Sequence, residues 1–213
     1  MPLDERRLLE RWPYCWHITD ARNAPALRRS RRLTPAAELR RLAGLPPPTV
    51  PRRSADERGL RAPGVGAVWL CDQNPLRFEY AAWQHCWDAA RLLDELNRRV
   101  FFWAGTVEGP NPRHGQAHFR RNRLDRATVE LRVPAADLFA ENPELAPEYA
   151  TCNSGALSPR SRRYNLRGDD TFRPASRLEG PPAKVSEITF PGVVRLPAST
   201  QLRAGEAAPW EAL

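Results

Sequence analysis

The apolar stretches of this sequence are short, which restricts the chain to a fold built from small strands and helices. The segments WPYCWHIT at residues 12–19 and RVFFWAG at residues 99–105 predict buried strands. Residues 127–134, ATVELRVP, alternate between apolar and other side chains, as a strand with one buried face does. None of these segments approaches the ~20 apolar residues that a membrane-spanning helix needs, so we expect no membrane segment.

Helical and loop patterns separate these strands. The spacing of apolar residues and the positions of capping residues predict helices over residues 3–11, 23–33, 35–42 and 78–98. In the second of these helices, Asn23 is the expected N-cap and Pro25 lies in the first turn. Residues 45–66 are rich in Pro, Gly and Arg and are expected to form a mobile loop.

The last part of the chain contains a predicted strand with a single carboxylate. A loop region is expected over residues 141–182, and KVSEITFPGVV at residues 184–194 predicts a strand around Glu187. The C-terminal tail is expected to be poorly ordered or an edge segment. The order of the elements predicts a mixed α+β fold in one domain of 213 residues, with its core at about residues 12–193.

The chain is strongly basic, with a formal charge of +8 and Lys184 as the single lysine among 33 basic residues. A GC-rich genome would produce such a preference for Arg, but guanidinium groups also bind phosphates in a bidentate manner. Nucleic acid is therefore a candidate partner. The charged N-terminus, MPLDERRLLERW, lacks the apolar core of a secretory signal, so we expect a cytoplasmic protein.

The Cys and His residues do not form a recognisable metal site. The four cysteines are scattered, without a CxxC or CxxH pair, and are expected to be buried free thiols. His114 and His118 are four residues apart, but Gly115 and the preceding Pro and Asn residues oppose the helix that such a site would need. We expect no metal, and we expect His85 to be structural within the Trp-rich helix.

Common catalytic motifs are absent, because the sequence contains no G-x-S-x-G elbow, Walker loop, G-x-G-x-x-G or H-E-x-x-H. His17 closes the first aromatic strand and Thr19 follows it, so this histidine is either a core residue or a functional one. Strict alternation in the late strand places Val185, Glu187 and Thr189 on one face. From this pattern, Glu187 is either a carboxylate that faces water or a charge stabiliser at a cleft.

The order of three segments resembles the ADP-ribosyltransferase superfamily. A strand with the pattern H-x-T, formed by His17 and Thr19, comes first; an aromatic strand over residues 100–104 follows, and Glu187 lies in a late strand. This order is similar to the three-motif core of the superfamily's histidine–aromatic–glutamate branch.

More specifically, the chain resembles an uncharacterised bacterial family within that superfamily. The shared segments are short and lie in order across most of residues 14–193: Asp72-Gln73 with Pro75-Leu76, Leu96-Asn97 with Arg99 to Trp103, Asn153 to Ala156, Arg167-Gly168 with Asp170 to Phe172, and Glu187. DNA-modifying toxins of the DarT type also open with an H-x-T strand and close with a glutamate strand, and they look like more distant relatives.

The resemblance implies a split, mostly antiparallel sheet with flanking helices, which holds NAD as a co-substrate in the cleft between its halves. His17 would hydrogen-bond the adenosine-side ribose, and Thr19 would support it. Phe101 stands where many relatives have tyrosine, so the apolar wall of the site is kept and the hydroxyl is lost. Stacking on nicotinamide would then fall to Phe102, Trp103 or another aromatic side chain.

The same resemblance assigns the catalytic role to Glu187, together with His17. The carboxylate would bind a ribose hydroxyl and stabilise the positive charge that develops as the nicotinamide–ribose bond breaks. Close relatives often carry a basic residue just before the Asp-Gln pair, where this chain has Cys71; Arg77 is the nearest guanidinium that could serve a phosphate. Target recognition is assigned to residues that are equally typical of ordinary turns, namely Asp72, Gln73, Asn153, Ser154, Gly155, Asp170 and Thr171.

The leading hypothesis is an NAD-dependent ADP-ribosyltransferase, a glycosyltransferase, that modifies a macromolecule; the charge favours nucleic acid over protein. Two alternatives stay open: NAD hydrolysis at the same site, and a non-enzymatic basic module that binds nucleic acid. Most of the seven tryptophans lie in apolar strands or a helical stripe, which favours core packing over exposed stacking platforms. A toxin role and an antitoxin partner are expectations by analogy only.

Overall fold

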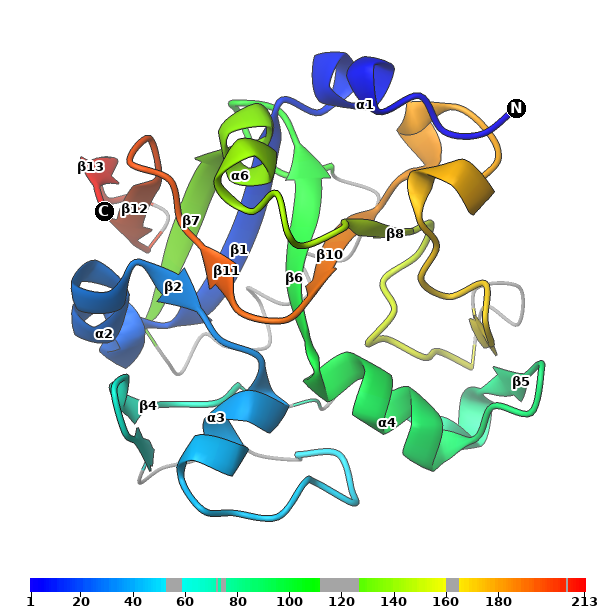
Figure 1. Cartoon of the computed structure of the whole chain (residues 1–213), viewed down its shortest axis with the longest axis horizontal. Helices are drawn as coiled ribbons and strands as arrows, with labels where there is room; N and C mark the ends of the chain where they lie inside the picture. The colour runs from blue at the N-terminus through cyan, green and yellow to red at the C-terminus, as the bar shows by residue number, and fades with distance from the viewer. Residues whose placement is uncertain (53–58, 72, 74–75, 112–126, 160–164, 206) are drawn as a thin grey trace.

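The computed structural model describes residues 1–52, 59–71, 73, 76–111, 127–159, 165–205 and 207–213. These residues form an α+β fold around a seven-stranded antiparallel sheet with the strand order β13-β12-β7-β1-β6-β10-β8 (Figure 1). The strands are β1 (Tyr14–Asp20), β6 (Arg99–Gly105), β7 (Thr128–Pro134), β8 (Glu148–Ala150), β10 (Glu187–Pro191), β12 (Gln201–Ala204) and β13 (Glu211–Ala212).

Helices and short ladders surround this sheet. The α-helices of the described residues are α1 (Glu5–Arg11), α2 (Ala24–Ser30), α3 (Ala36–Leu42), α4 (Ala89–Asn97) and α6 (Ala135–Glu141). The short ladders pair β2 (Arg32–Leu33) with β11 (Val194–Arg195), β3 (Leu60–Ala62) with β4 (Gly66–Val68), and β5 (Ala82–Trp83) with β9 (Leu166–Arg167).

The main core lies on the face of the sheet that α1, α2 and α6 cover. Leu8 of α1, Leu27 of α2 and Leu138 of α6 pack there with strand residues such as Phe102 and Phe190. In Figure 1, α6 and the β2–β11 ladder lie in front of this face. Burial of these side chains supplies the main driving force for the assembly of helices on the sheet.

The sheet opens between its two central strands. β1 and β6 pair from Tyr14–Gly105 to Trp16–Trp103, and their ladder ends there although β1 continues to Asp20. Beyond that point β1 remains paired with β7, and β6 remains paired with β10. The two halves diverge towards the lower side of Figure 1, where α3, α4 and the β3–β4 hairpin lie.

Two smaller apolar clusters support the rim of this opening. Leu39 of α3 packs with Val68 and other residues of the β3–β4 hairpin. Leu92 of α4 packs with Phe172 and neighbouring apolar side chains. The opening therefore has one packed wall on the side of the β3–β4 hairpin and another on the side of α4.

Several sequence predictions of local structure are confirmed. The strands predicted over residues 12–19, 99–105 and 127–134 are β1, β6 and β7, and the helices over residues 3–11 and 35–42 are α1 and α3. The C-terminal tail is an edge segment, because β12 and β13 extend the sheet beyond β7. Within the described part of the chain, none of the helices has the length and apolar character needed to cross a bilayer.

The helix predicted over residues 78–98 is wrong in its first half. α4 begins only after an N-cap at Asp88. Before it, β5 pairs with β9 from a distant part of the chain, and His85 and Cys86 adopt left-handed backbone with φ of 54° and 59°. Tertiary pairing overrides the helical spacing of this segment, and His85 is exposed instead of lying in a helical stripe.

The prediction for α2 also needs correction. The helix ends at Ser30 because Arg31 adopts left-handed backbone with φ of 47°, and the chain then enters β2. The Asn23 side chain makes no capping hydrogen bond. Its Nδ2 donates to Thr19 Oγ1 (2.8 Å) and to the Trp69 carbonyl (3.0 Å), and its Oδ1 accepts from the Trp69 N–H (2.8 Å). Asn23 therefore joins the end of β1 to the segment that follows β4.

The two predicted loop regions contain short strands. The range 45–66 includes β3 and the start of β4, while its residues 53–58 lie outside the described part of the chain. The range 141–182 includes β8, at the edge of the main sheet, and β9.

Substitutions of Asn23 distinguish its role as a bridge between Thr19 and Trp69 from the predicted role as the N-cap of α2. We expect Asn23→Ala to lower the free energy of unfolding by about 2 kcal/mol, because three hydrogen bonds are lost, one of them buried and two partly buried. Asn23→Asp should be at least as destabilising, since a carboxylate cannot donate to Thr19 Oγ1 or the Trp69 carbonyl, although Asp is a good N-cap. Urea unfolding of both variants measures the effect, and wild-type stability of Asn23→Asp would restore the capping interpretation.

Candidate functional site

A cavity of about 320 Å³ occupies the opening between β1 and β6. Its walls come from both halves of the sheet, from α2, α3 and the end of α4, and from the segments around Trp69 and Ser154. The sequence-predicted residues that line it are His17, Thr19, Gln73, Phe101, Trp103, Asn153, Ser154, Gly155 and Glu187. A cavity of this volume lies in the range that proteins use for small ligands.

Glu187 lies at the start of β10, and Ser154 binds its carboxylate. Its Oε2 accepts hydrogen bonds from the Ser154 backbone N–H (3.1 Å) and hydroxyl (2.6 Å). Only 4% of Glu187 is exposed, and it lines the cavity opposite Trp103 of the neighbouring strand. The carboxylate is therefore a buried group that a ligand in the cavity would meet.

The alternation predicted for the late strand is wrong at its first residue. β10 begins at Glu187, and Val185 precedes the strand and packs in the main core. Glu187 and Thr189 do share one face, where their partners on β6 are Trp103 and Phe101. This face is the one that meets the cavity.

Burial raises the pKa of Glu187 from 4.5 to about 7, because the charged carboxylate loses water. The hydrogen bonds from Ser154 and the positive charge of Arg167 act in the opposite direction and limit this rise. Near neutral pH the carboxyl is therefore balanced between its protonated and ionised forms. A strongly shifted group that faces a cavity is typical of a functional site.

Arg167 is fully buried behind Ser154 and shapes the loop that carries it. At distances of 2.8–3.2 Å, its guanidinium donates to the backbone carbonyls of Asn153, Ser154, Ala156 and Leu166. The planar fork of an arginine suits such converging acceptors. Arg167 thus fixes the position of Ser154 and brings positive charge close to Glu187.

His17 lies where β1 and β6 separate. Its Nδ1 is 2.8 Å from the Phe101 carbonyl oxygen, and since a carbonyl only accepts, Nδ1 carries the proton and donates it. Burial lowers the pKa of His17, and the bond to the Phe101 carbonyl partly opposes this effect. The neutral ring then keeps Nε2 as a hydrogen-bond acceptor. Since His17 lines the cavity, it suits a ligand with a hydroxyl group.

His17 and Glu187 come from opposite faces of the sheet. Trp16 pairs with Trp103, which pairs with Glu187, so these three side chains share one face. His17 is the next residue along β1 and therefore points to the other face, where its partner is Leu131 of the main core. The two candidate residues line one cavity because the sheet is open between β1 and β6.

The aromatic residues predicted to contact nicotinamide are divided between the cavity and the core. Phe101 and Trp103 line the cavity, and Phe101 also packs edge-on against Phe172. Phe102 is completely buried in the main core. The prediction that Phe102 belongs to the site is therefore wrong. Successive side chains of β6 point to opposite faces of the sheet, so Phe102 points to the core while Phe101 and Trp103 point to the cavity.

Three other predicted residues lie away from the cavity wall. Arg77 is exposed and is not among the residues that line the cavity. Asp170 and Thr171 line a second, polar pocket of about 310 Å³. There the Thr171 hydroxyl accepts a hydrogen bond from the Gly168 N–H (2.9 Å), as a turn residue does.

Five residues named by the sequence analysis lie outside the described part of the chain: Asp72, Pro75, His114, Gly115 and His118. Across the residues that are described, no group of three or more His, Cys, Asp or Glu side chains converges as metal ligands would. The thiols of Cys15, Cys71, Cys86 and Cys152 are free. Of these four, Cys15 alone is fully buried, and Cys86 is exposed.

Sequence reasoning missed Arg52 and Arg167 as site residues. Each is one arginine among many in this basic chain, and each contacts residues that are distant in the sequence. Arg167 does stand in a segment that supports the family resemblance, but nothing in its spacing indicates four carbonyl contacts. Burial of the guanidinium is the property that distinguishes Arg167, and it becomes visible only in the folded chain.

The fold and the site define a class of protein: an α+β fold with an open antiparallel sheet and a buried carboxylate at a ligand-sized cavity. Residues 13–198 match a family described as a family of unknown function, DUF7002, and the chain belongs to this family. No curated protein and no solved structure matches the chain.

The shifted pKa of Glu187 predicts a stability effect of its removal. Between pH 4.5 and about 7 the folded protein keeps a proton that the unfolded chain has lost, so this carboxyl lowers the free energy of unfolding as pH rises. We expect Glu187→Gln to be more stable than wild type by up to about 3 kcal/mol above pH 7, and the difference should vanish near pH 4.

Thermal and urea unfolding across this pH range measure the difference between Glu187→Gln and wild type. Glu79→Gln, at an exposed position, is the matched control and should show no such pH dependence. A difference between Glu187→Gln and wild type that stays constant with pH would contradict the raised pKa.

Proposed function

We propose that this protein is an NAD-dependent ADP-ribosyltransferase whose essential carboxylate is Glu187. The observation that carries the proposal is the placement of Glu187, buried at a ligand-sized cavity, bound by Ser154 and opposite Trp103. The opening of the sheet between β1 and β6 supports the split-sheet, ADP-ribosyltransferase type of fold within the same proposal.

The proposed reaction transfers ADP-ribose from NAD to a nucleophile of the target. The bond between ribose C1′ and the nicotinamide nitrogen breaks, and nicotinamide leaves as a neutral molecule with the bonding electron pair. The ribose carries oxocarbenium-like positive charge in the transition state, and the Glu187 carboxylate stabilises it. The nucleophile of the acceptor then bonds to C1′ and loses its proton to solvent or a nearby base.

The other residues of the cavity suit the remaining parts of NAD. His17, with Nδ1 held by the Phe101 carbonyl, offers Nε2 to a ribose hydroxyl. Phe101 and Trp103 supply an apolar, aromatic wall beside Glu187 for the nicotinamide ring. Thr19 is two residues beyond His17 and lines the same cavity, with its hydroxyl oriented by Asn23.

The proposed acceptor is a macromolecule, with nucleic acid ahead of protein because the chain carries a formal charge of +8. NAD hydrolysis, in which water takes the place of the acceptor, is the alternative that the same cavity allows. A cytoplasmic location and a toxin role, with an antitoxin as partner, belong to this proposal by analogy.

The direct test incubates the protein with NAD labelled in its ADP-ribose part, together with DNA, RNA or cell protein. We expect labelled nucleic acid with wild type, and a loss of rate on the order of 10²- to 10³-fold in Glu187→Gln, with NAD affinity retained. Glu79→Gln should keep the wild-type rate. Label on protein would select the other acceptor class, and free ADP-ribose would select hydrolysis.

An absence of NAD turnover by the wild type in all of these incubations would overturn the proposal. Salt-dependent binding of DNA without NAD turnover would support the non-enzymatic module in its place. Wild-type transfer by Glu187→Gln would show that another group stabilises the ribose.

Ser154 provides a second test, based on pH. Ser154→Ala removes the 2.6 Å hydroxyl donor to Glu187, so the pKa of this carboxyl should rise further. The ionised form is the one that stabilises the ribose, so the acidic limb of the rate profile should move to higher pH by up to about one unit. Ser176→Ala, at an exposed position, is the control. An unchanged acidic limb would contradict the role of Ser154.

A further inference from the structure

We infer that Phe78, Tyr80 and Trp83 form a stacking surface for the unpaired bases of a single-stranded nucleic acid, which is the acceptor of the proposed transfer. We call these three side chains the aromatic platform. The inference deepens the proposed function and rests on it, because it names the class of acceptor and the surface that holds it. Neither the family match nor the sequence patterns assign a ligand to any of the three residues.

The aromatic platform is exposed, in contrast to the other tryptophans of the chain. Trp83 is 37% exposed and Tyr80 is 39% exposed, and within the described residues they are the only exposed Phe, Tyr or Trp side chains. Phe78 is half-buried, and its ring centre lies 6.2 Å from that of Trp83 at an angle of 49°. Exposed aromatic rings give up the stabilisation that burial would provide, so a place that collects them indicates an interaction surface.

The platform is held in place by contacts with the rest of the fold. Phe78 packs against the apolar cluster that α4 supports. In the short 3-10 helix Phe78–Tyr80, the Tyr80 N–H donates to the Arg77 carbonyl (3.1 Å). Directly after β5, the Gln84 N–H donates to the Arg167 carbonyl (2.9 Å). A surface fixed in this way loses little conformational freedom when a ligand stacks on it.

The platform borders the end of the cavity that holds Glu187. Trp83 is the strand partner of Arg167, and paired residues of neighbouring strands point to the same face. The Arg167 guanidinium donates to the carbonyls of Asn153 and Ser154, so Trp83 lies on the side of the β5–β9 ladder that faces this segment. Ser154 in turn binds the Glu187 carboxylate. An acceptor strand on the platform is therefore held beside the segment that positions this carboxylate.

The charge beside the platform favours a nucleic acid over a protein. Arg77 immediately precedes Phe78 and is exposed, and it forms no ion pair with Glu79 or with any other carboxylate in the part of the chain that the structure describes. Its guanidinium is therefore available to a phosphate group next to the rings. The family resemblance suggests Arg77 for a phosphate of NAD, but its position outside the cavity wall suits a phosphate of the acceptor. The formal charge of +8 adds attraction at long range.

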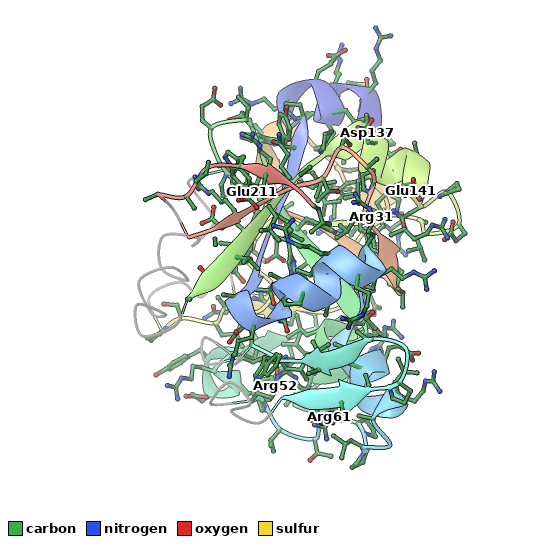
Figure 2. All side chains as sticks on the ribbon, turned by 90° about the vertical axis from the view of Figure 1, so that its left-hand side faces the viewer. Arg31, Arg52, Arg61, Asp137, Glu141 and Glu211 are labelled. Carbon is green, nitrogen blue, oxygen red and sulfur yellow. The ribbon has the colours of Figure 1, made fainter. Side chains whose placement is uncertain are left out.

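The end of the molecule away from β5 carries charges of both signs, many of which pair with one another. Figure 2 views this end, where Glu141 and Glu211 lie on either side of Arg31. Arg28 pairs with Glu211 (2.8 Å), and Arg195 pairs with Glu141 (3.7 Å). The positive charge of the chain therefore does not by itself select this end as the binding surface, and the exposed rings of the platform distinguish the other end.

The test measures binding of fluorescein-labelled single strands of thymidine or uridine, about 12 nucleotides long, by fluorescence anisotropy without NAD. A duplex of the same length is the comparison. We expect Trp83→Ala to weaken binding of single strands by about 10- to 100-fold, and Tyr80→Ala by a smaller factor. Leu45→Ala is the matched control, because Leu45 is as exposed as Tyr80 and lies after α3. It should bind like wild type. Wild type should prefer single strands, because the bases of a duplex are not free to stack.

Two further measurements separate the contribution of the rings from that of charge. Trp83→Phe keeps an aromatic ring and should retain part of the affinity. It should lose most of the quenching of tryptophan fluorescence by bound bases, because Trp83 is the exposed tryptophan. Arg77→Gln removes one phosphate contact, so the slope of log affinity against log salt should become shallower by about 0.7. Trp83→Ala should leave this slope unchanged.

Several results would overturn the platform. They are wild-type affinity for single strands in Trp83→Ala, an equal loss in Leu45→Ala, equal binding of duplex and single strands by wild type, or a wild type that binds neither oligonucleotide. If circular dichroism shows that Trp83→Ala does not fold, the fluorescence of Trp83→Phe decides. Loss of quenching in that variant supports the platform, and quenching equal to that of wild type overturns it.

The outcome for the platform can be separated from that of the proposed function. Binding of single strands that depends on Trp83, together with a wild type that never turns over NAD, would keep the platform and reject the transferase. Glu187-dependent transfer to nucleic acid with an unchanged KM for the oligonucleotide in Trp83→Ala would keep the transferase and reject the platform. If both proposals hold, Trp83→Ala raises this KM and leaves kcat close to that of wild type.

Discussion

The site depends on one interruption of backbone pairing, the end of the β1–β6 ladder after Trp16 and Trp103. Buried backbone groups need partners, and an opening in the middle of a sheet leaves such groups on both strands. The imidazole of His17 meets part of this need, because its Nδ1 donates to the Phe101 carbonyl on the opposite strand. A side chain of β1 thus takes a place that a backbone N–H would have filled. The opening is stabilised by a residue that also faces the cavity.

The opening also explains how side chains that point to opposite faces of the sheet can contact one ligand. In a closed sheet, His17 and Glu187 would be separated by the sheet itself, because they point to different faces. Once β1 and β6 diverge, side chains of both faces line the same space. Asn23 fixes the far wall of that space by joining Thr19 to the backbone of Trp69. The cavity therefore depends on the register of the strands and on a few side chains that join its walls.

The sequence predicted the elements whose burial is encoded locally. Short apolar or alternating runs located β1, β6 and β7, and the position of Glu187 in a late strand was also correct. The contacts that shape the site were not predictable, because each joins distant positions: Arg167 to the carbonyl of Ser154, and Arg52 to Asn97. The false helix over residues 78–98 has the same origin, since pairing of β5 with β9 decides that segment. The spacing of residues within one segment does not indicate such distant partners.

The environment of Glu187 contains some features that oppose ionisation of its carboxyl and others that favour it. Removal of water raises its pKa, whereas Ser154 and the charge of Arg167 lower it, and the result lies near neutrality. Arg167 is able to act in this way because backbone carbonyls hold its guanidinium in a buried position. A ligand that brings positive charge next to Trp103, as the nicotinamide ring of NAD would, shifts this balance towards the carboxylate. Binding of such a ligand and loss of the Glu187 proton would then be coupled, so the proposed substrate would itself increase the ionised fraction of the carboxylate.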